Sequence, residues 1–361
     1  MKKFEDKSIY DKVENFRNGF AAVKRNGKWG FVNEQCEEVV PCKYDEVVDF
    51  SDGYFSDGFA KVKLDGKWGK VNKQGEEVIP CKYDEVGNFF DGFARVQLDG
   101  KWGFVDENGE EVTPFKYDEV GNFYEGLVAV ALADKWGFVN EQDEEIVPCK
   151  YDEVGNFFDG FARVQLDGKW GFVDENGEEV VPCKYDDVVD SSEGYYFCEG
   201  FARVQLDGKW GFVDENGEEV IPCKYDEVGD FSEGLAAVAL AGAHRWGFVN
   251  EQYEEVVPCI YDSVGWFYEG FAMVEYEGGK FGIVNKQGQE VVPSIYDFVE
   301  DFSNGFANVE LDGKFGKVND QGEVVIPCEY DEVGDFSEGF AEVALDGKWG
   351  KVNTRGEEFW D

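Results

Sequence analysis

Lys101-Trp102-Gly103-Phe104-Val105-Asp106-Glu107-Asn108-Gly109-Glu110-Glu111-Val112 is the stretch that decides the fold, because some version of it recurs ten times along the chain. A Tyr-Asp pair and an acidic-Gly-Phe-Ala step keep the same rhythm, and the commonest spacing is 34 residues. A fixed period of this size predicts a repeat architecture. The aromatic-Gly dipeptide that marks each copy begins at Trp29, Trp68, Trp102, Trp136, Trp170, Trp210, Trp246, Phe281, Phe315 and Trp349.

One copy has the pattern of short antiparallel strands. In Phe93–Leu98, small and aliphatic residues alternate with polar ones, which is typical of a half-buried strand. Asp99-Gly100 then predicts a tight hairpin turn, and Lys101–Asp106 is the returning strand. Asn108-Gly109 predicts a second turn of the same kind, before another strand over Glu110–Thr113. Each copy is therefore expected to hold three or four short strands.

The prolines mark the joints between copies. All nine lie at the same place in the repeat, shortly before the next Tyr-Asp pair. Proline removes a backbone donor, so it suits a kink between units better than the middle of a central strand. Tyr83–Phe90 is expected to be extended, with a bulge at Gly87. The predicted units are residues 10–41, 44–80, 83–114, 117–148, 151–182, 185–222, 225–258, 261–293, 296–327 and 330–361.

The Trp-Gly dipeptide has a physical explanation of its own. The ring offers a large apolar area, and the missing side chain on glycine leaves room for another ring or backbone to lie close. Phe281 and Phe315 take the ring position in two copies, so the position requires a flat apolar ring and not an indole NH.

These residues carry a resemblance to a known family. Gly-Lys-Trp-Gly-Phe-Val-Asp-Glu-Asn-Gly-Glu-Glu-Val, continued by Pro-Cys-Lys-Tyr-Asp-Glu-Val, resembles the WG repeat (also called KWG repeat) of bacterial proteins. The resemblance covers the chain from Tyr10 to Trp360, and it implies a β-rich bacterial repeat protein without shared catalytic residues. There is a looser similarity to the choline-binding cell-wall repeat, which shares a Gly-Lys-Trp hairpin.

We therefore predict an all-β tandem array of ten units of about 34 residues, each a β-meander or hairpin. An open, superhelical or solenoid-like arrangement is favoured, because propellers usually have four to eight blades and longer repeats. A closed, propeller-like ring is the alternative.

Charge narrows the range of partners. The chain has 78 acidic and 34 basic residues, a net charge of −44. Such a surface repels phosphate backbones and anionic lipid, so neither nucleic acid nor membrane is expected as a partner. A solvated face that keeps a β-rich array soluble is one interpretation, and attraction for a basic partner or weak, nonspecific divalent cation association is the other.

The ends and the cysteines bear on location. No apolar core of signal-peptide length follows Met1, and no run approaches 18 apolar residues, so we expect a cytoplasmic protein. Seven of the nine cysteines share one repeat position, one unit apart, which does not suit a Cys-x-x-Cys ligand set. We expect small, half-buried, reduced thiols.

The residues for catalysis are few, and no enzyme activity is expected. His244 is the only histidine and lies in a widened turn. Paired carboxylates recur in every copy, which favours a structural or solubility role over an active site. The Asp-Glu-Asn-Gly-Glu-Glu loops at 106–111, 174–179 and 214–219 lack the ligand pattern of an EF-hand, and no phosphate-binding glycine motif occurs. No cofactor and no metal site are expected.

Positions that break the repeat are the candidates for partner contact. Insertions before the Gly-Phe-Ala step add aromatic residues in the second and sixth copies, and insertions of repeat arrays often gather on one face. A tryptophan replaces the usual Asn or Asp in the eighth copy. The alternative is that the inserted rings fold back to extend the core. The candidates are Tyr54, Phe55, Tyr195, Tyr196, Phe197 and Trp266.

The leading hypothesis is a non-catalytic binding or scaffold protein. It would present an acidic, aromatic-rich repeat surface to a protein or peptide partner, possibly a basic one, through many weak copies of one contact. The alternatives are glycan or cell-wall-type ligand binding on aromatic platforms, and an acidic structural spacer or decoy that acts through its negative field.

Overall fold

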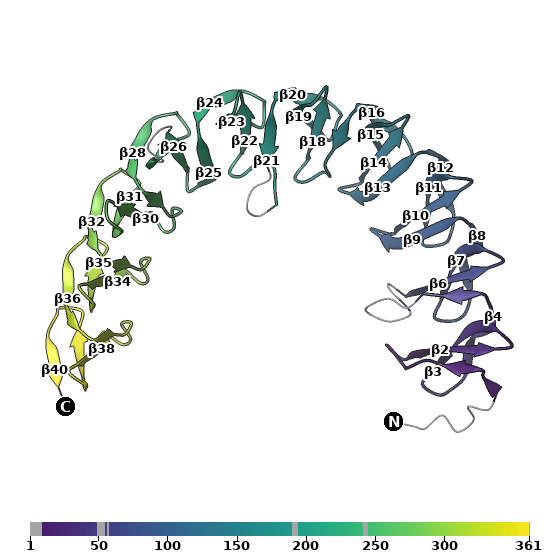
Figure 1. Cartoon of the computed structure of the whole chain (residues 1–361), viewed down its shortest axis with the longest axis horizontal. Coiled ribbons are helices and arrows are strands. Elements are labelled where there is room, and N and C mark those ends of the chain that lie inside the picture. Colours follow the sequence, from purple (N-terminus) through teal and green to yellow (C-terminus); the bar gives the residue numbers. More distant parts are fainter. Residues whose placement is uncertain (1–8, 49–54, 56–57, 190–193, 241–244, 361) are drawn as a thin grey trace. The chain divides into compact units, whose positions relative to one another are not determined.

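A computed structural model describes residues 9–48, 55, 58–189, 194–240 and 245–360. These residues form short β-strands joined by tight turns (Figure 1). No helix long and apolar enough to cross a membrane occurs among them. The strands make ten four-stranded antiparallel sheets, none of which closes into a barrel. The prediction of an all-β tandem array of ten units is confirmed.

The chain divides into two compact units, which are described separately. The first unit holds residues 1–168 and 172–179, and the second holds residues 169–171 and 180–361. Within each unit the main contacts connect strands of one sheet or of consecutive sheets. This nearest-neighbour organisation is that of a solenoid.

Each of the first five sheets consists of four strands in chain order. They are β1 (Lys12–Val13), β2 (Phe20–Arg25), β3 (Lys28–Asn33) and β4 (Glu38–Tyr44); β5 (Glu46–Val47), β6 (Phe59–Leu64), β7 (Lys67–Asn72) and β8 (Glu77–Tyr83); β9 (Glu85–Phe90), β10 (Phe93–Leu98), β11 (Lys101–Asp106) and β12 (Glu111–Tyr117); β13 (Glu119–Tyr124), β14 (Leu127–Leu132), β15 (Lys135–Asn140) and β16 (Glu145–Tyr151); and β17 (Glu153–Val154), β18 (Phe161–Leu166), β19 (Lys169–Asp174) and β20 (Glu179–Tyr185).

The sixth to tenth sheets have the same order. They are β21 (Asp187–Val189), β22 (Phe201–Leu206), β23 (Lys209–Asp214) and β24 (Glu219–Tyr225); β25 (Glu227–Ser232), β26 (Leu235–Leu240), β27 (Arg245–Asn250) and β28 (Glu255–Tyr261); β29 (Ser263–Val264), β30 (Phe271–Tyr276), β31 (Lys280–Asn285) and β32 (Glu290–Tyr296); β33 (Phe298–Val299), β34 (Phe306–Leu311), β35 (Lys314–Asn319) and β36 (Val324–Tyr330); and β37 (Glu332–Val333), β38 (Phe340–Leu345), β39 (Lys348–Asn353) and β40 (Glu358–Trp360).

The third sheet shows how closely the local predictions hold. Strands β10 and β11 have the predicted bounds, and they pair antiparallel across a turn in which Asp99 and Gly100 both have positive φ. Between β9 and β10 the register shifts opposite Arg95, so Gly87 and Asn88 face one residue. The bulge predicted at Gly87 is confirmed.

The Asn-Gly turn differs from the prediction. Only Gly109 has positive φ there, and the Asp106 side chain accepts hydrogen bonds from the backbone N–H of Asn108, at 2.9 Å, and of Glu110, at 2.8 Å. The loop is therefore an Asx turn closed by a left-handed glycine, whereas the prediction of a second two-residue hairpin turn was wrong. The Asp106 carboxylate accepts hydrogen bonds from two backbone N–H groups that, in a two-residue Asn-Gly hairpin, would be left for the paired strands to satisfy.

The prolines also lie elsewhere than expected. Pro114 is inside β12, which continues to Tyr117, and the fourth strands of the first nine sheets are all longer than predicted in this way. This strand is at the edge of its sheet, and its pairing with β11 shifts register beside the proline, so no ladder donor is lost from a central strand. Sheets consequently meet between Tyr117 and Asp118, whereas the predicted units begin at the tyrosine.

The glycine after each ring allows this fourth strand to cross closely. A Cβ atom on Gly137 would collide with the carbonyl oxygen of Val147 and would lie 2.7 Å from the backbone nitrogen of Cys149. The expectation that this glycine leaves room for a neighbouring backbone is confirmed.

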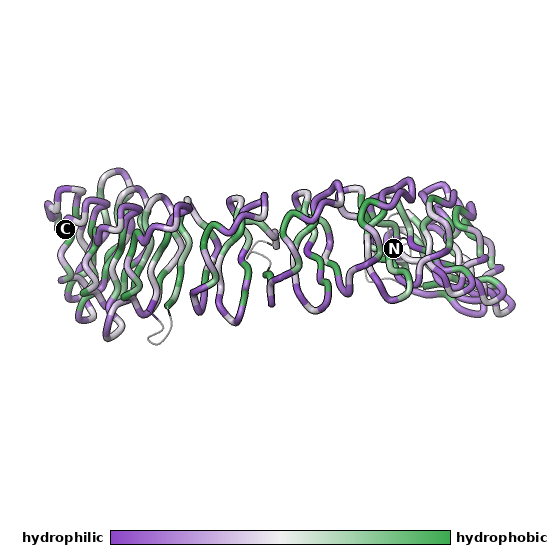
Figure 2. Tube along the Cα trace, turned by 90° about the horizontal axis from the view of Figure 1, so that it is seen from above, coloured by the Kyte–Doolittle hydropathy of each residue, from purple (hydrophilic) through white to green (hydrophobic). Residues whose placement is uncertain are grey.

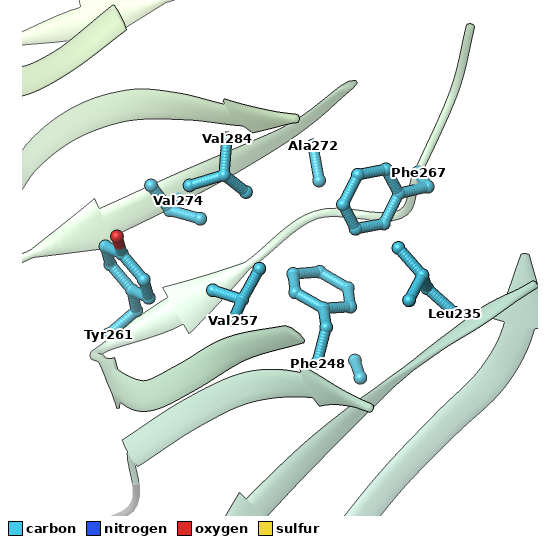
Figure 3. Packing of buried hydrophobic residues seen from close by; sticks show 9 residues of the cluster. Leu235, Phe248, Val257, Tyr261, Phe267, Ala272, Val274 and Val284 are labelled. Carbon is cyan, nitrogen blue, oxygen red and sulfur yellow. The ribbon is translucent and has the colours of Figure 1, made fainter. Parts of the chain in front are cut away.

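Aromatic rings join consecutive sheets. A Phe at the start of the second strand lies against a ring from the next sheet, as in Phe93–Phe123 and Phe271–Phe302, whose ring centroids are each 4.6 Å apart. Figure 3 shows one such junction, in which Phe267 packs against Phe248 of the preceding sheet among Val and Ala side chains. In Figure 2 the hydrophobic positions lie along the strands and the hydrophilic ones at the turns. Neighbouring repeats therefore share their cores.

Candidate functional site

The aspartate of each Tyr-Asp pair is engaged inside the array. Asp297 lies 2.5 Å from the Lys280 Nζ of the preceding repeat and accepts a hydrogen bond from the backbone N–H of Asp312 in the next hairpin, at 2.7 Å. The hydrogen bond from Lys280 lowers the pKa of Asp297. The same lysine–aspartate pair recurs 17 residues apart in Lys28–Asp45, Lys67–Asp84, Lys101–Asp118, Lys135–Asp152, Lys169–Asp186, Lys209–Asp226 and Lys314–Asp331. These carboxylates stabilise the array and leave little to offer a ligand.

The repeated cysteines are also internal. All nine are free, and the seven that share a repeat position are half-buried. The Cys223 thiol donates to the Val204 carbonyl oxygen at 3.6 Å, and burial raises its pKa to about 11. A thiol with so high a pKa is a poor nucleophile at neutral pH. The expectation that these thiols are half-buried is confirmed.

Two of the four inserted aromatic residues that the structure describes are buried. Phe55 is only 5 % exposed and packs against Phe20 and Phe31, with ring centroids 4.5 and 5.2 Å away. It fills the position that Phe123 fills in the fourth sheet, where Phe123 packs against Phe93 and Phe104. Tyr196 is 4 % exposed. Of the two interpretations of the insertions, exposure for partner contact is wrong for both rings, and the alternative, that the rings fold back to extend the core, is confirmed for them. Burial of a large apolar ring between repeats is more favourable than its exposure to water.

The remaining candidates of the insertions differ. Tyr195 is exposed and Phe197 is half-buried, whereas Tyr54 lies outside the described residues, as does His244. Among the described residues, no cluster of three His, Cys, Asp or Glu side chains could hold a metal ion.

Trp266 is the most exposed of the candidates that the structure describes, and a second exposed ring that sequence reasoning missed lies two residues away. Trp266 and Tyr268 are 67 % and 62 % exposed and lie on either side of Phe267, which is 2 % exposed. The signal was available, because residues two apart in an extended segment share a face. The segment is fixed by hydrogen bonds from Gly265 N–H to the Met273 carbonyl, at 2.9 Å, and from Tyr268 N–H to Phe271, at 2.8 Å.

A row of unpaired carboxylates follows the Asx turns. The residue after the Asx residue is an exposed glutamate in six repeats, and none of these six takes part in a hydrogen bond or ion pair with another described residue. We call them the carboxylate row: Glu34, Glu107, Glu141 and Glu175 in the first unit, and Glu215 and Glu251 in the second. Half-buried Asp320 takes the same repeat position in the ninth repeat.

Lysine interrupts this position twice, and both places border a groove. In the second unit a groove of about 620 Å³ is lined by Glu269, Lys286, Glu290 and Asp320, among others. The Lys286 Nζ lies 3.0 Å from the carboxylate of Glu233 in the preceding sheet. Lys286 is therefore engaged there and does not neutralise the other three carboxylates of the groove, those of Glu269, Glu290 and Asp320. In the first unit a groove of about 610 Å³ is lined by equivalent residues, including Lys73, Glu77 and Glu107.

Ten consecutive matches to the pattern described as "WG containing repeat" cover the chain, at residues 7–29, 29–68, 68–102, 102–136, 136–170, 170–210, 210–242, 246–280, 281–315 and 315–349. The chain belongs to the WG-repeat family. The resemblance of the repeated Gly-Lys-Trp-Gly stretches to the WG repeat is thereby confirmed. No curated protein is similar enough in sequence to match the chain.

Several solved structures are similar to the WG-repeat chain at low identity. The computationally designed Ika8 protein is 14 % identical, with 85 % of this chain and 94 % of that chain covered and a TM-score of 0.29. A eukaryotic initiation factor is 11 % identical, with coverage of 94 % and 95 % and a TM-score of 0.34. Kluyveromyces lactis Hsv2p is 11 % identical, with coverage of 66 % and 93 % and a TM-score of 0.28. These low scores carry no argument about function.

Proposed function

We propose that this WG-repeat chain is a non-catalytic binding protein that recognises a basic protein or peptide. The carboxylate row carries the proposal: it places an unpaired carboxylate at the same position in four repeats of the first unit and in two of the second. Many weak contacts of this kind sum along a partner that offers a series of cations.

The distribution of charge supports this function. The lysines of the lysine–aspartate pairs neutralise the aspartates within the array. The glutamates of the carboxylate row have no such lysine among the described residues, so they can interact with a partner. Net charge of −44 attracts cations over a distance of about 8 Å at physiological salt. It also speeds the encounter with a basic partner and repels anionic competitors. Free cysteines fit a reducing, cytoplasmic setting for this function.

Titration calorimetry with a short lysine homopeptide tests the proposal. We expect binding at low ionic strength that weakens steeply as salt approaches about 0.15 M, because exposed charges are screened. A glutamate homopeptide of equal length is the control and should give no heat of binding. Absence of binding to the basic peptide at low salt would refute the function.

A row of rings in the first unit favours glycan binding as a second candidate. Phe90, Tyr124 and Phe158 come from three consecutive sheets, and their ring centroids are 5.2 and 5.7 Å apart in sequence order. Such a strip could serve as a platform for sugar rings. Neutral oligosaccharides titrated in the same way test this function, which requires binding that does not depend on salt. However, contacts between these rings also hold consecutive repeats together, which is a structural role. The hydrogen bond that the Ser232 hydroxyl donates to the Phe267 carbonyl, at 2.8 Å, likewise joins two repeats.

A further inference from the structure

The geometry points to Trp266 and Tyr268 as an anchor for an arginine-bearing stretch of the basic partner. This inference rests on the proposed function and adds a specific place and a specific side chain to it. Both rings belong to the second unit, in the loop between β29 and β30.

The two rings are rigidly presented although they are exposed. Phe267, between them, is buried against Phe248 with ring centroids 4.7 Å apart, and it belongs to the core in Figure 3. The turn that follows is tied to the preceding repeat, because Glu233 accepts a hydrogen bond from the Gly270 N–H at 2.9 Å. Because the backbone that carries the two rings is already fixed, binding requires little further ordering of the main chain, which favours these residues as interface anchors.

No nearby repeat shares this arrangement. The residue at the place of Trp266 is Asp230 in the preceding repeat and Asp301 in the next one, and the places of Tyr268 are taken by Ser232 and Ser303. Asp230 is paired with Arg203 at 2.9 Å, whereas Asp301 is exposed. An aromatic pair thus stands alone among acidic and small polar positions.

The charges beside the pair select a cation. Glu269 directly follows Tyr268 and is exposed, and its carboxylate makes no hydrogen bond or ion pair with another described residue. It lines the groove that also contains Glu290 and Asp320. A guanidinium group stacks on an indole face and donates hydrogen bonds to a carboxylate at the same time, whereas an ammonium group is a compact charge with stronger hydration. The partner is therefore expected to place arginine on Trp266.

Arginine and lysine homopeptides of equal length test the inference by titration calorimetry on the whole chain. We expect the wild-type chain to bind the arginine peptide several-fold more tightly than the lysine peptide. The double variant Trp266→Ser/Tyr268→Ser should bind the arginine peptide roughly five- to tenfold more weakly than the wild type does, with little change in its affinity for the lysine peptide. Phe298→Ser, which removes an exposed ring from β33, is the control and should keep the preference. Both variants should unfold at the wild-type temperature, because the rings that they remove are exposed.

The outcomes separate the two proposals. Equal affinity for both peptides, or a preference for arginine that survives Trp266→Ser/Tyr268→Ser, would overturn the anchor while leaving the basic-partner function in place. Failure of the wild-type chain to bind either peptide would overturn the function and the anchor together.

Discussion

Single residues explain why this repeat tolerates so little change at the Trp-Gly dipeptide. Gly137 lies beneath the crossing of β15 and β16, where any side chain would strike the backbone of the fourth strand. Gly121, in the same repeat, would place a Cβ atom 3.5 Å from the Cβ of Ala129, an ordinary contact. The two glycines are both in strands, but only the first is required by a close approach.

Replacing Gly137 with alanine should lower the free energy of unfolding by about 1–3 kcal/mol, because the fourth strand must move away. Gly121→Ala is the matched control and should change it by no more than about 0.5 kcal/mol. Chemical denaturation followed by circular dichroism measures both. Similar losses in the two variants would show that the close crossing is not what requires glycine.

Among the candidate residues, the sequence distinguished poorly between core and surface. Phe55 and Tyr196 occur in insertions, yet both are buried. Phe55 lies four residues before Phe59, as the core ring Phe89 lies four before Phe93, whereas no such spacing marks Tyr196 as a buried ring. Tyr268 was overlooked since Phe90, Tyr124 and Phe158 occupy its position elsewhere and make it look ordinary. Comparison with the neighbouring repeats would have set it apart, because Ser232 and Ser303 take the same position there.

Strands and turns follow from local patterns where one residue type decides the backbone. The Asp99-Gly100 turn and the bounds of β10 and β11 are of this kind, because alternation and positive φ are local properties. The course of β12 through Pro114 could not be predicted, because it depends on an edge position that only the assembled sheet defines.

The lysine–aspartate pairs connect these elements and make stability depend on pH. The hydrogen bond from Lys135 lowers the pKa of Asp152 below its ordinary value of 3.8, and that from Lys101 does the same for Asp118. Their stabilisation is thus complete above about pH 4 and is lost as the pH falls through the lowered pKa values. At alkaline pH, the hydrogen bond to Asp152 raises the pKa of Lys135 above its ordinary value of 10.5. The stabilisation that Lys135 contributes is therefore lost only as the pH rises through this raised pKa.

The double variant Asp118→Asn/Asp152→Asn should unfold at a lower temperature than the wild type at pH 7. Its unfolding temperature should also fall less between pH 7 and pH 3, because two of the groups that titrate with folding are gone. Glu119→Gln/Glu153→Gln, which removes the same charge from the adjacent exposed residues, is the control. Parallel pH profiles for the two variants would contradict a specific role of the pairs.

At the scale of the whole molecule, the repeat period and the composition predicted the number of units, their β-structure and their acidic surface. The division between engaged and free carboxylates could not be predicted, because both kinds occur once in most repeats. It depends on which side chains the neighbouring repeat reaches. That division is also what gives the proposed function its physical basis.

The most direct measurement of this function compares two sets of six Glu→Gln substitutions that remove equal charge. One set neutralises the carboxylate row, and the other neutralises Glu46, Glu85, Glu119, Glu153, Glu227 and Glu332, which are exposed at the start of first strands. Binding of the lysine homopeptide at low salt should weaken roughly tenfold or more in the row variant and distinctly less in the control, because each exposed contact contributes about 0.2–1 kcal/mol. Equal weakening in the two variants, which the net field alone would produce, would contradict the account.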